Sequence, residues 1–463
     1  MAVRDTLADY FGFEEHGTDL ETELLAGLTT FLAMSYIVVV NPDILVRSGA
    51  ISPTGYSEGQ VFQMVAIVTI ISAVVATGIM ALYANRPFGQ APGLALNAFF
   101  AFTVVIGMGI SWQTALAAVF VEGLVFIALT LVGARRYVIE LFPEPVKLAV
   151  GTGIGLFLAL IGLVEMQVVT GSGGTIVNLG NVAQNPVALL ALAGLAVTLM
   201  LYARGVPGSI IIGIVGTTLA AYAFEAANVV DQGVLTPGNL PEATYNISPL
   251  AGAFIEGLGN IEAASFALVV FTFFFVDFFD TAGTLTGVGQ AAGFLDDEGN
   301  LPEIEKPLMA DAVGTTVGSA LGTSTVTTFV ESATGVEEGG RTGMTALTVA
   351  GLFLLALVFV PLAAGVPGYA SHIALVVVGV IMLRNVGEIL WDDLTYAVPA
   401  GMTILVMPFT YNIGYGIAAG IIAYPLVKVG AGELRDTHPA HWIMAGLFVV
   451  YFYVRTSGLL TTI

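Results

Sequence analysis

Fourteen apolar segments follow one another along this chain of 463 residues, and they constrain its fold more than any other feature. A helix needs about 20 mainly apolar residues to cross a bilayer, and most of these segments approach that length. They lie at residues 24–45, 61–83, 91–109, 112–132, 145–165, 186–203, 207–226, 263–285, 308–321, 324–336, 341–364, 370–386, 394–411 and 413–430. The sequence therefore predicts an all-α polytopic membrane protein with fourteen transmembrane segments.

The composition excludes most other classes of protein. Only 10% of the residues are charged, against about 25% in a soluble domain, and 56% are hydrophobic. A soluble enzyme or a disordered chain could not have this balance. The 34 acidic and 13 basic residues give a net charge of −21, which argues against nucleic acid as a partner. The chain has no Cys, so disulfides and thiolate chemistry are excluded.

The basic residues predict the orientation of the segments. With a cytoplasmic N-terminus, eleven of the thirteen lie on the cytoplasmic side, as the positive-inside rule requires. These are Arg4, Arg86, Arg135, Arg136, Lys147, Arg204, Lys306, Arg341, Arg384, Lys428 and Arg435. Only Arg47 lies outside, and the side of Arg455 depends on whether a short run at 441–454 crosses. We expect a cell-membrane protein with both termini in the cytoplasm, the run 441–454 lying at the interface or against the bundle, and no cleavable signal peptide.

The acidic residues gather in the expected loops. They include Asp19, Glu21, Glu23, Asp296, Asp297, Glu298, Glu303, Glu305, Glu337, Glu338, Asp392 and Asp393. A mouth that attracts cations is one interpretation. We favour a solvated surface adapted to high salt, where repulsion between like charges is screened, and infer a salt-loving source.

Fourteen segments divide into seven plus seven, and an odd number in each half forces the second half to insert upside down. The third segment of each half opens with a run poor in helix formers: 89–97 contains Gly and Pro, and 318–328 is rich in Thr and β-branched residues. Paired broken segments at matching positions indicate a binding site near the middle of the membrane. We therefore expect an inverted repeat with a short extended piece in segments 3 and 10.

Ionisable residues inside membrane segments are rare and commonly functional. Asp277 and Asp280 lie on one helix face with Thr281 and Thr284, and Gly283 permits close helix packing. A carboxyl group in low dielectric favours its neutral form, and a group that takes up and releases a proton suits proton coupling. We select Asp280 over Asp277 for function; the alternative is a protonated acid that only bonds a neighbouring helix.

Two more polar residues belong to the broken segments. Glu331 follows the extended piece of segment 10, where a half-helix would begin, and a carboxylate there is stabilised by free N–H groups or accepts from a ligand. Asn97 is the polar residue of an apolar run, and its amide both donates and accepts. Glu122 and Glu165 are interpreted as structural, with Glu122 pairing across helices. The four His are dispersed, so we expect no metal and no cofactor.

Four motifs resemble one known family: Thr30–Pro42 (TFLAMSYIVVVNP), Ala91–Phe100 (APGLALNAFF), Phe279–Leu285 (FDTAGTL) and Thr327–Gly335 (TTFVESATG). They are similar to the nucleobase–cation symporter-2 (nucleobase/ascorbate transporter) superfamily, and in particular to its AzgA-like branch of adenine, guanine and hypoxanthine permeases. The resemblance covers essentially the whole chain.

The resemblance implies two domains, each built from both halves of the repeat. After a cytoplasmic segment at 1–23, a core domain would comprise 24–132 and 263–364, a gate domain 145–226 and 370–430, and a C-terminal segment 431–463. It further implies an elevator-like shift of core against gate, a homodimer, and symport of a purine nucleobase with H⁺, or with Na⁺ in some relatives.

The resemblance also implies the residues of the site. Asp280 would bind the substrate and couple the proton, and Glu331, as the second proton-coupling acid, would contact the purine ring. Asn97 and Thr284 would face the same pocket, and backbone groups near Leu96 and Val330 would bond the ring edges. Thr328 and Ser332 complete the predicted set. Uracil and xanthine relatives usually carry Glu where this chain has Asp280, which favours the purine branch.

Other functions stay open at this point. An anion or bicarbonate carrier on the same fold would want a positive charge or bare helix N-termini at the site, whereas two acids dominate here. A uracil or xanthine permease is a closer alternative. A channel would need a sustained polar stripe, and a membrane enzyme a nucleophile–base pair or a metal set; the sequence has neither.

Overall fold

The computed structural model describes residues 2–133, 142–172, 175–238, 242–259, 261, 263–296 and 301–456. Arg135, Arg136, Asp297 and Glu298 lie outside the described residues. Within them, ten helices are long and apolar enough to cross a membrane.

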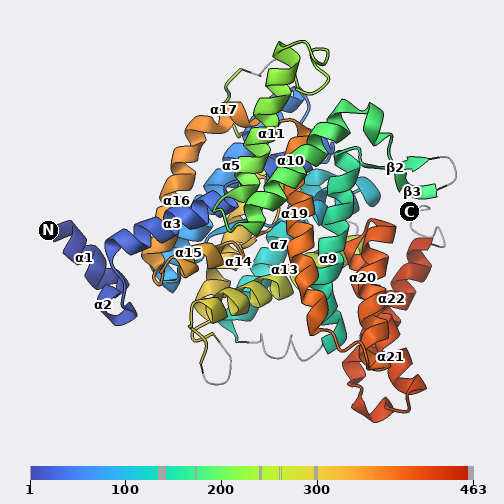
Figure 1. The fold of residues 1–463 in the computed structure, drawn as a ribbon. Helices are drawn as coiled ribbons and strands as arrows, with labels where there is room; N and C mark the ends of the chain where they lie inside the picture. The colour runs from blue at the N-terminus through green and yellow to red at the C-terminus, as the bar shows by residue number, and fades with distance from the viewer. Residues whose placement is uncertain are drawn as a thin grey trace. The chain divides into compact units, whose positions relative to one another are not determined.

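Each segment of the first half corresponds to a predicted span (Figure 1). They are α3, α4 and η1 (Leu20–Met34, Ile37–Pro42, Asp43–Arg47); α5 and η2 (Glu58–Ile79, Met80–Ala84); β1, α6 and η3 (Gln90–Pro92, Leu94–Ala98, Phe99–Gly107); α7 (Trp112–Leu131); α9 (Glu144–Glu165); α10 (Pro186–Ala203); and α11 (Ser209–Ala226).

The second half repeats this order. Its segments are α13 (Ala263–Ala291); α14 (Glu305–Leu321); β4 and α15 (Val326–Thr328, Ser332–Glu337); α16, η5 and α17 (Gly343–Ala356, Leu357–Phe359, Val360–Ala363); α18, α19 and η6 (Gly368–Ser371, Ile373–Met382, Leu383–Glu388); α20 (Leu394–Thr410); and α21 (Ile413–Gly430). The third segment of each half is the broken one, as the sequence predicts.

Shorter elements lie outside the repeat. They are α1 (Ala2–Phe11), α2 (Phe13–His16), β2 and β3 (Val169–Ser172, Thr175–Leu179), η4 (Val182–Gln184), α12 (Ala253–Leu258), η7 (Leu434–Asp436) and α22 (Pro439–Thr456). The helix α22 contains the apolar run 441–454, is longer than that run, and packs on α21.

Local sequence explains where several helices begin. The Asp19 side chain accepts hydrogen bonds from the N–H groups of Glu21 and Thr22, which starts α3, and these bonds hold the pKa of Asp19 below its ordinary value. Ser57 and Gln60 form a reciprocal capping box at α5. Asn185 caps α10, with Pro186 at its first position.

One loop acid has a different environment from the one we predicted. Glu23 is fully buried, and it accepts hydrogen bonds from the N–H groups of Arg341, Thr342 and Thr345 and from the Thr345 hydroxyl at 2.6 Å. It therefore satisfies the free N–H groups where α16 begins. The interpretation of Glu23 as a solvated loop residue was wrong, because position within a sequence cluster does not reveal a distant helix end.

The chain forms two compact units: residues 1–131 with 161–377, and residues 132–160 with 378–463. In the first unit α14 packs on both α7 and α5, α16 packs on α3 and α5, and α10 lies beside α11 (Figure 1). In the second, α20, α21 and α22 pack in succession. The core and gate boundaries given above stay a prediction.

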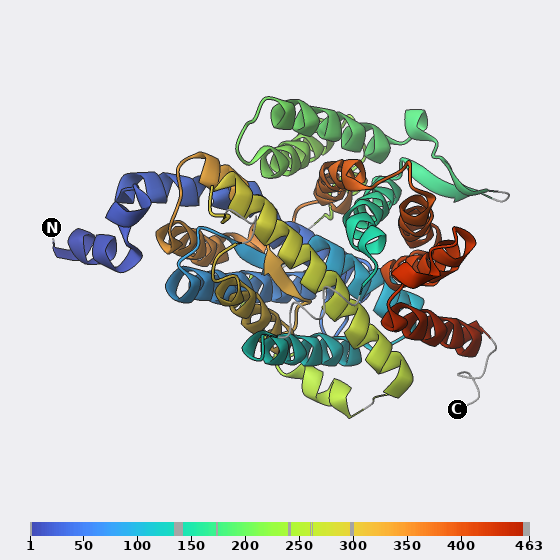
Figure 2. The same cartoon turned by 90° about the horizontal axis from the view of Figure 1, so that it is seen from below.

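The two broken segments meet inside the first unit. Strand β1 pairs with β4 in antiparallel register, Gln90 opposite Thr328 and Pro92 opposite Val326, and every residue of both strands is buried. Figure 2 shows their two short arrows side by side. The N–H groups of Gly93 and Phe329 extend the pairing by bonding the carbonyls of Thr325 and Gly89, each at 3.0 Å. Extended backbone is tolerated at membrane depth only when its polar groups are satisfied in this way.

Close approach of helices in this unit depends on small residues. A Cβ placed on Gly335 of α15 would lie 2.1 Å from the Thr30 hydroxyl and 2.5 Å from the Ala26 carbonyl oxygen of α3. A Cβ on Gly351 of α16 would meet nothing within 4 Å. The α3–α15 contact therefore requires Gly at 335, whereas Gly351 is free of that constraint.

We predict that Gly335→Val lowers the free energy of unfolding by about 1–3 kcal/mol, because the added atoms overlap main-chain atoms that cannot move aside. Thermal unfolding in detergent measures the effect, with Gly351→Val as the matched control that leaves the midpoint nearly unchanged. Equal midpoints for the two variants would contradict the packing argument.

Candidate functional site

The residues that follow β4 build one part of the candidate site. Glu331 precedes the first residue of α15, as the sequence predicts, and it is partly buried. Tyr36, between α3 and α4, donates its hydroxyl hydrogen to Glu331 Oε1 at 2.5 Å and is 1% exposed. The Tyr36 ring also lies 6.3 Å from the Phe329 ring, centroid to centroid. One Glu331 oxygen is thus held by the first span.

Asp280 of α13 lies beside this group. Its side chain is partly buried, and Glu331 is close enough to interact with it electrostatically. The structure therefore brings together Asp280 and Glu331, which the sequence predicts as a pair. Thr284, one turn further along α13, is also partly buried. Val330 is 48% exposed, so the chain next to Glu331 borders open space.

The other predicted residues lie in the buried layer behind these acids. Asn97 of α6 accepts a hydrogen bond from the Ser324 hydroxyl, and its Nδ2 has no partner. Leu96 is fully buried next to it. The Ser332 hydroxyl accepts from the Gly89 N–H at 3.0 Å, which joins the start of α15 to the chain before β1. Ser332 therefore has a structural bond in addition to its predicted role.

Asp277 does not share the surroundings of Asp280, although both lie on α13. It is fully buried and lies close enough to Glu122 on α7 to interact with it electrostatically. The Thr281 hydroxyl lies 3.3 Å from an Asp277 oxygen and 3.1 Å from an oxygen of Asp311 on α14. Glu122, Asp277 and Asp311 thus form a buried carboxyl cluster that joins α7, α13 and α14. No hydrogen bond to either Glu122 oxygen is found among the described residues, so the pairing of Glu122 across helices stays a prediction.

The paired strands β1 and β4, called here the β1–β4 ladder, carry the side chains that hydrogen-bond with this carboxyl cluster. Gln90 of β1 donates through Nε2 to Asp311 Oδ1 and to the Thr328 hydroxyl, both at 3.1 Å. The Thr327 hydroxyl of β4 lies 2.7 Å from that of Thr281. Thr328 therefore faces the carboxyl cluster and takes part in its hydrogen bonding. No ion pair to the three acids is found among the described residues, where the ion pairs are formed by Asp43, Glu58, Glu303 and Glu433.

Sequence reasoning missed three residues of this arrangement: Tyr36, Gln90 and Asp311. Asp311 is an ionisable residue inside the predicted span 308–321 and could have been found by the rule that selected Asp277. Tyr36 lies within the motif Thr30–Pro42, and Gln90 lies within the broken run 89–97. What makes them part of the site is contact with residues some 220 to 295 positions away.

The arrangement suits recognition of a small neutral molecule better than covalent chemistry. Two carboxyl groups can accept from N–H donors, and aromatic rings at Tyr36 and Phe329 lie beside them. Acids, amides and hydroxyls on broken membrane segments are typical of carriers. The fold and the site together define a membrane transport protein.

Comparison with known families agrees. A family profile described as "Permease family", that of the xanthine/uracil permeases, matches residues 21–419. The chain belongs to this family, the nucleobase/ascorbate transporters.

Three similar curated proteins match along nearly their whole length. The guanine/hypoxanthine permease PbuG of Bacillus subtilis is 42% identical, covering 96% of this chain and 98% of that protein. The guanine/hypoxanthine permease PbuO of the same organism is 40% identical, covering 96% and 100%. The adenine permease AdeP of Escherichia coli is 38% identical, covering 95% and 94%.

Solved structures share the fold at low identity. The transmembrane domain of the cyanobacterial bicarbonate transporter BicA has a TM-score of 0.57 at 18% identity, covering 87% of this chain and 97% of that one. The murine anion transporter Slc26a9 in its inward-facing state has a TM-score of 0.59 at 12% identity, covering 89% and 68%. These likenesses confirm the predicted seven-plus-seven fold and carry no information on the substrate.

We predict that Gln90→Leu lowers the free energy of unfolding by about 1–3 kcal/mol, because Asp311 and Thr328 lose a buried donor. Gln290→Leu, the same change at an exposed position of α13, is the control and should alter stability by about 0.5 kcal/mol or less. Thermal or denaturant unfolding in detergent measures both, and similar losses would show that Gln90 does not support the cluster.

Proposed function

We propose that this protein imports purine nucleobases, namely adenine, guanine or hypoxanthine, by symport with protons. The observation that carries the proposal is the pair Asp280 and Glu331 beside the β1–β4 ladder, in a chain 38–42% identical to adenine and guanine/hypoxanthine permeases. We further propose a cell-membrane location with both termini in the cytoplasm.

The chemistry of a purine fits these side chains. The ring edge presents N–H donors beside unprotonated nitrogen atoms, so it needs acceptors and donors at fixed positions. Asp280 and the free oxygen of Glu331 supply acceptors, and the Asn97 Nδ2 is a donor without a partner in the layer behind. Tyr36 and Phe329 supply aromatic surface for a flat ring.

The carboxyl cluster supports the choice of the proton as coupling ion. The single Thr281 hydrogen cannot serve Asp277 and Asp311 at once, and neither Glu122 oxygen has a hydrogen-bond partner among the described residues. Among the described residues the three fully buried acids have no basic partner, and as carboxylates they would carry a large desolvation cost. We therefore propose that the cluster holds protons. Asp277 lies one turn of α13 from Asp280, so the carboxyl cluster is adjacent to the pair Asp280 and Glu331 that is proposed to bind the substrate.

Alternating access in this proposal is an elevator-like shift of the core domain against the gate domain, in a homodimer. The extended pieces stay paired during the movement, since both belong to the core. The acidic loops suit a source that lives in high salt.

An anion or bicarbonate carrier on the same fold is the alternative that the sequence leaves open. Among the described residues neither Asp280 nor Glu331 has an ion pair with a basic side chain, which argues against an anion. Uptake assays distinguish the proposal from a uracil or xanthine permease and from a carrier coupled to Na⁺.

In proteoliposomes we expect an imposed inward proton gradient to drive saturable accumulation of radiolabelled hypoxanthine, guanine or adenine, with no requirement for sodium. Uracil, xanthine and bicarbonate tested in parallel should accumulate little. Bicarbonate flux without purine flux would move the assignment to an anion or bicarbonate carrier, and purine uptake that needs sodium would replace the coupling ion.

Substitution of Asp280 and substitution of Glu331 should impair different steps of transport. Asp280→Asn should abolish gradient-driven accumulation while sparing purine exchange, because the amide cannot take up a proton. Glu331→Gln should weaken purine affinity by about 1–3 kcal/mol, or roughly 5- to 150-fold, because an acceptor oxygen becomes an NH₂ donor. Uptake and counterflow assays separate these effects.

The matched controls are Asp231→Asn and Glu338→Gln, the same changes at exposed positions outside the site. Both should transport as the parent protein does. Unchanged accumulation and unchanged affinity in Asp280→Asn and Glu331→Gln would disprove the assignment of the site.

A further inference from the structure

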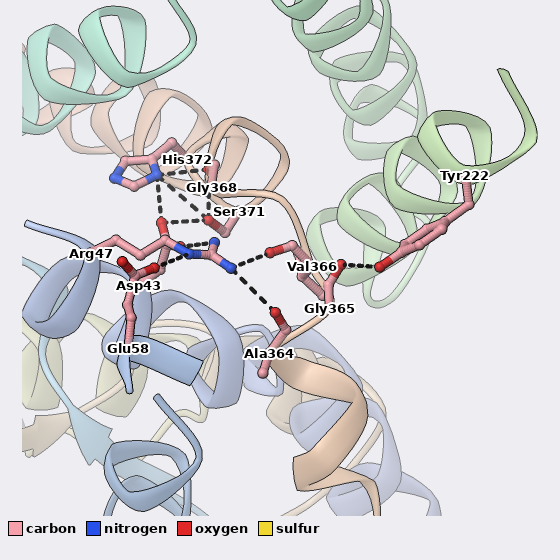
Figure 3. A network of polar contacts seen from close by, with 10 residues as sticks. All are labelled: Asp43, Arg47, Glu58, Tyr222, Ala364, Gly365, Val366, Gly368, Ser371 and His372. Atoms are coloured by element: carbon pink, nitrogen blue, oxygen red, sulfur yellow. Dashed lines mark hydrogen bonds and ion pairs between the residues drawn. The ribbon is translucent and has the colours of Figure 1, made fainter. Parts of the chain in front are cut away.

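A second network of charged side chains, which includes neither Asp280 nor Glu331, lies at the end of the first span (Figure 3). Asp43 and Arg47 are the first and last residues of η1, Ser371 ends α18, and His372 directly precedes α19. The side chains of Asp43, His372 and Arg47 are 0%, 4% and 19% exposed, respectively. Charges buried to this extent in a membrane protein call for a specific explanation.

Asp43 is the centre of this network. It accepts from the Ser371 hydroxyl at 2.7 Å, contacts His372 Nδ1 at 2.7 Å, and pairs with the Arg47 guanidinium. His372 Nδ1 also lies 2.8 Å from the Gly368 carbonyl oxygen. The Ser371 hydroxyl lies further away, at 3.5 Å, and donates to Asp43. The two short contacts of Nδ1 are to acceptors, so this nitrogen carries the hydrogen and donates. The carboxylate thus draws on donors from two distant parts of the chain.

Arg47 extends the network to the turn between α17 and α18. It donates through Nη2 to the carbonyls of Val366 at 2.6 Å and Ala364 at 3.4 Å. The intervening carbonyl, that of Gly365, accepts from the Tyr222 hydroxyl of α11 at 3.1 Å (Figure 3). Three successive carbonyls of this turn are therefore held by side chains from other spans.

The same span reaches both this network and the candidate site. Tyr36, which holds Glu331, lies seven residues before Asp43, and α4 spans Ile37–Pro42 between them. A displacement of the first span that accompanies a change at Glu331 would therefore also move Asp43. Since removing one partner of a buried charge network leaves the others unpaired, these contacts will break together rather than one by one.

We propose that Asp43, Arg47, Ser371 and His372 form a latch that closes one side of the transporter. The latch holds the end of the first span against the α17–α19 segment in one access state, and it opens when the site is exposed on that side. It rests on the proposed transport function. In the domain division implied by the sequence, Asp43 and Arg47 belong to the core, and Ser371 and His372 to the gate, so an elevator movement would separate them.

The absence of Cys from the sequence allows a direct test. Val330→Cys next to Glu331 reports access to the site, and Ser52→Cys in the exposed turn before α5 identifies the side on which the latch lies. A membrane-impermeant thiol reagent applied from that side should label Val330→Cys slowly. Adding Asp43→Asn or His372→Ala should raise the labelling rate about fivefold or more, in the range typical of coupling between sites.

Two further variants keep this test decisive. Ser371→Ala removes a single hydrogen bond and should raise labelling by a smaller factor, even if the charge variants fold poorly. Glu58→Gln is the matched control, because Glu58 is 67% exposed and lies 3.7 Å from Arg47 without contacting Asp43, so labelling should not change. Equal labelling rates in all of these proteins would overturn the latch.

Cross-linking tests whether the latch must open. In the double variant Asp43→Cys/Ser371→Cys, a short cleavable bifunctional thiol reagent should stop transport, and reduction should restore it. Full transport by the cross-linked protein would also overturn the proposal. The labelling test needs no substrate, so a protein that shows latch-dependent labelling but no purine flux would refute the proposed function and leave the latch standing.

Discussion

The pairing of β1 with β4 is the interaction on which the rest of the functional unit depends. Neither strand could exist alone at membrane depth, because its N–H and carbonyl groups would have no partners. Each broken segment supplies what the other lacks, so the third segments of the two halves must meet. The helices α5, α13 and α14 pack around the ladder, and they bring Thr77, Thr281 and Thr315 to its backbone and side chains.

The ladder also determines which acids become neighbours. Gln90 and Thr328 lie opposite each other in the register, and together they contact Asp311 from one side of the pair. Where β4 ends, the chain turns into α15 and places Glu331 near Asp280. In the proposed function, substrate recognition and proton storage belong to two adjacent groups of carboxyl groups, joined through the single turn of α13 between Asp277 and Asp280.

The first span connects these carboxyl groups to the network of Asp43, Arg47, Ser371 and His372. Its hydroxyl at Tyr36 restrains one oxygen of Glu331, and its carboxylate at Asp43 binds donors beyond the end of α17. A carrier alternates between two access states, and buried charges that are satisfied in only one geometry can hold it in one of them. The proposed latch is such a group, at the end of a span that also touches the candidate site.

Much of the architecture follows from the sequence by itself. Apolar length determines the spans, with ends such as 186–203 and 413–430 reproduced at both limits. Low helix propensity at 89–97 and 318–328 marks the broken segments, although only 90–92 and 326–328 are strands and 318–321 belong to the end of α14. Asp280 and Glu331 could be found because a carboxyl group in an apolar run is costly. Only the tertiary structure decides that Asp277 faces Glu122 and Asp311 while Asp280 faces Glu331, that Glu23 is buried, and that Tyr36, Gln90 and His372 are partners of acids. Spacing along one helix fixes a face but not what lies opposite that face. The contacts of Glu23, Tyr36, Gln90 and His372 join residues hundreds of positions apart, and their meeting depends on the packing of the two halves.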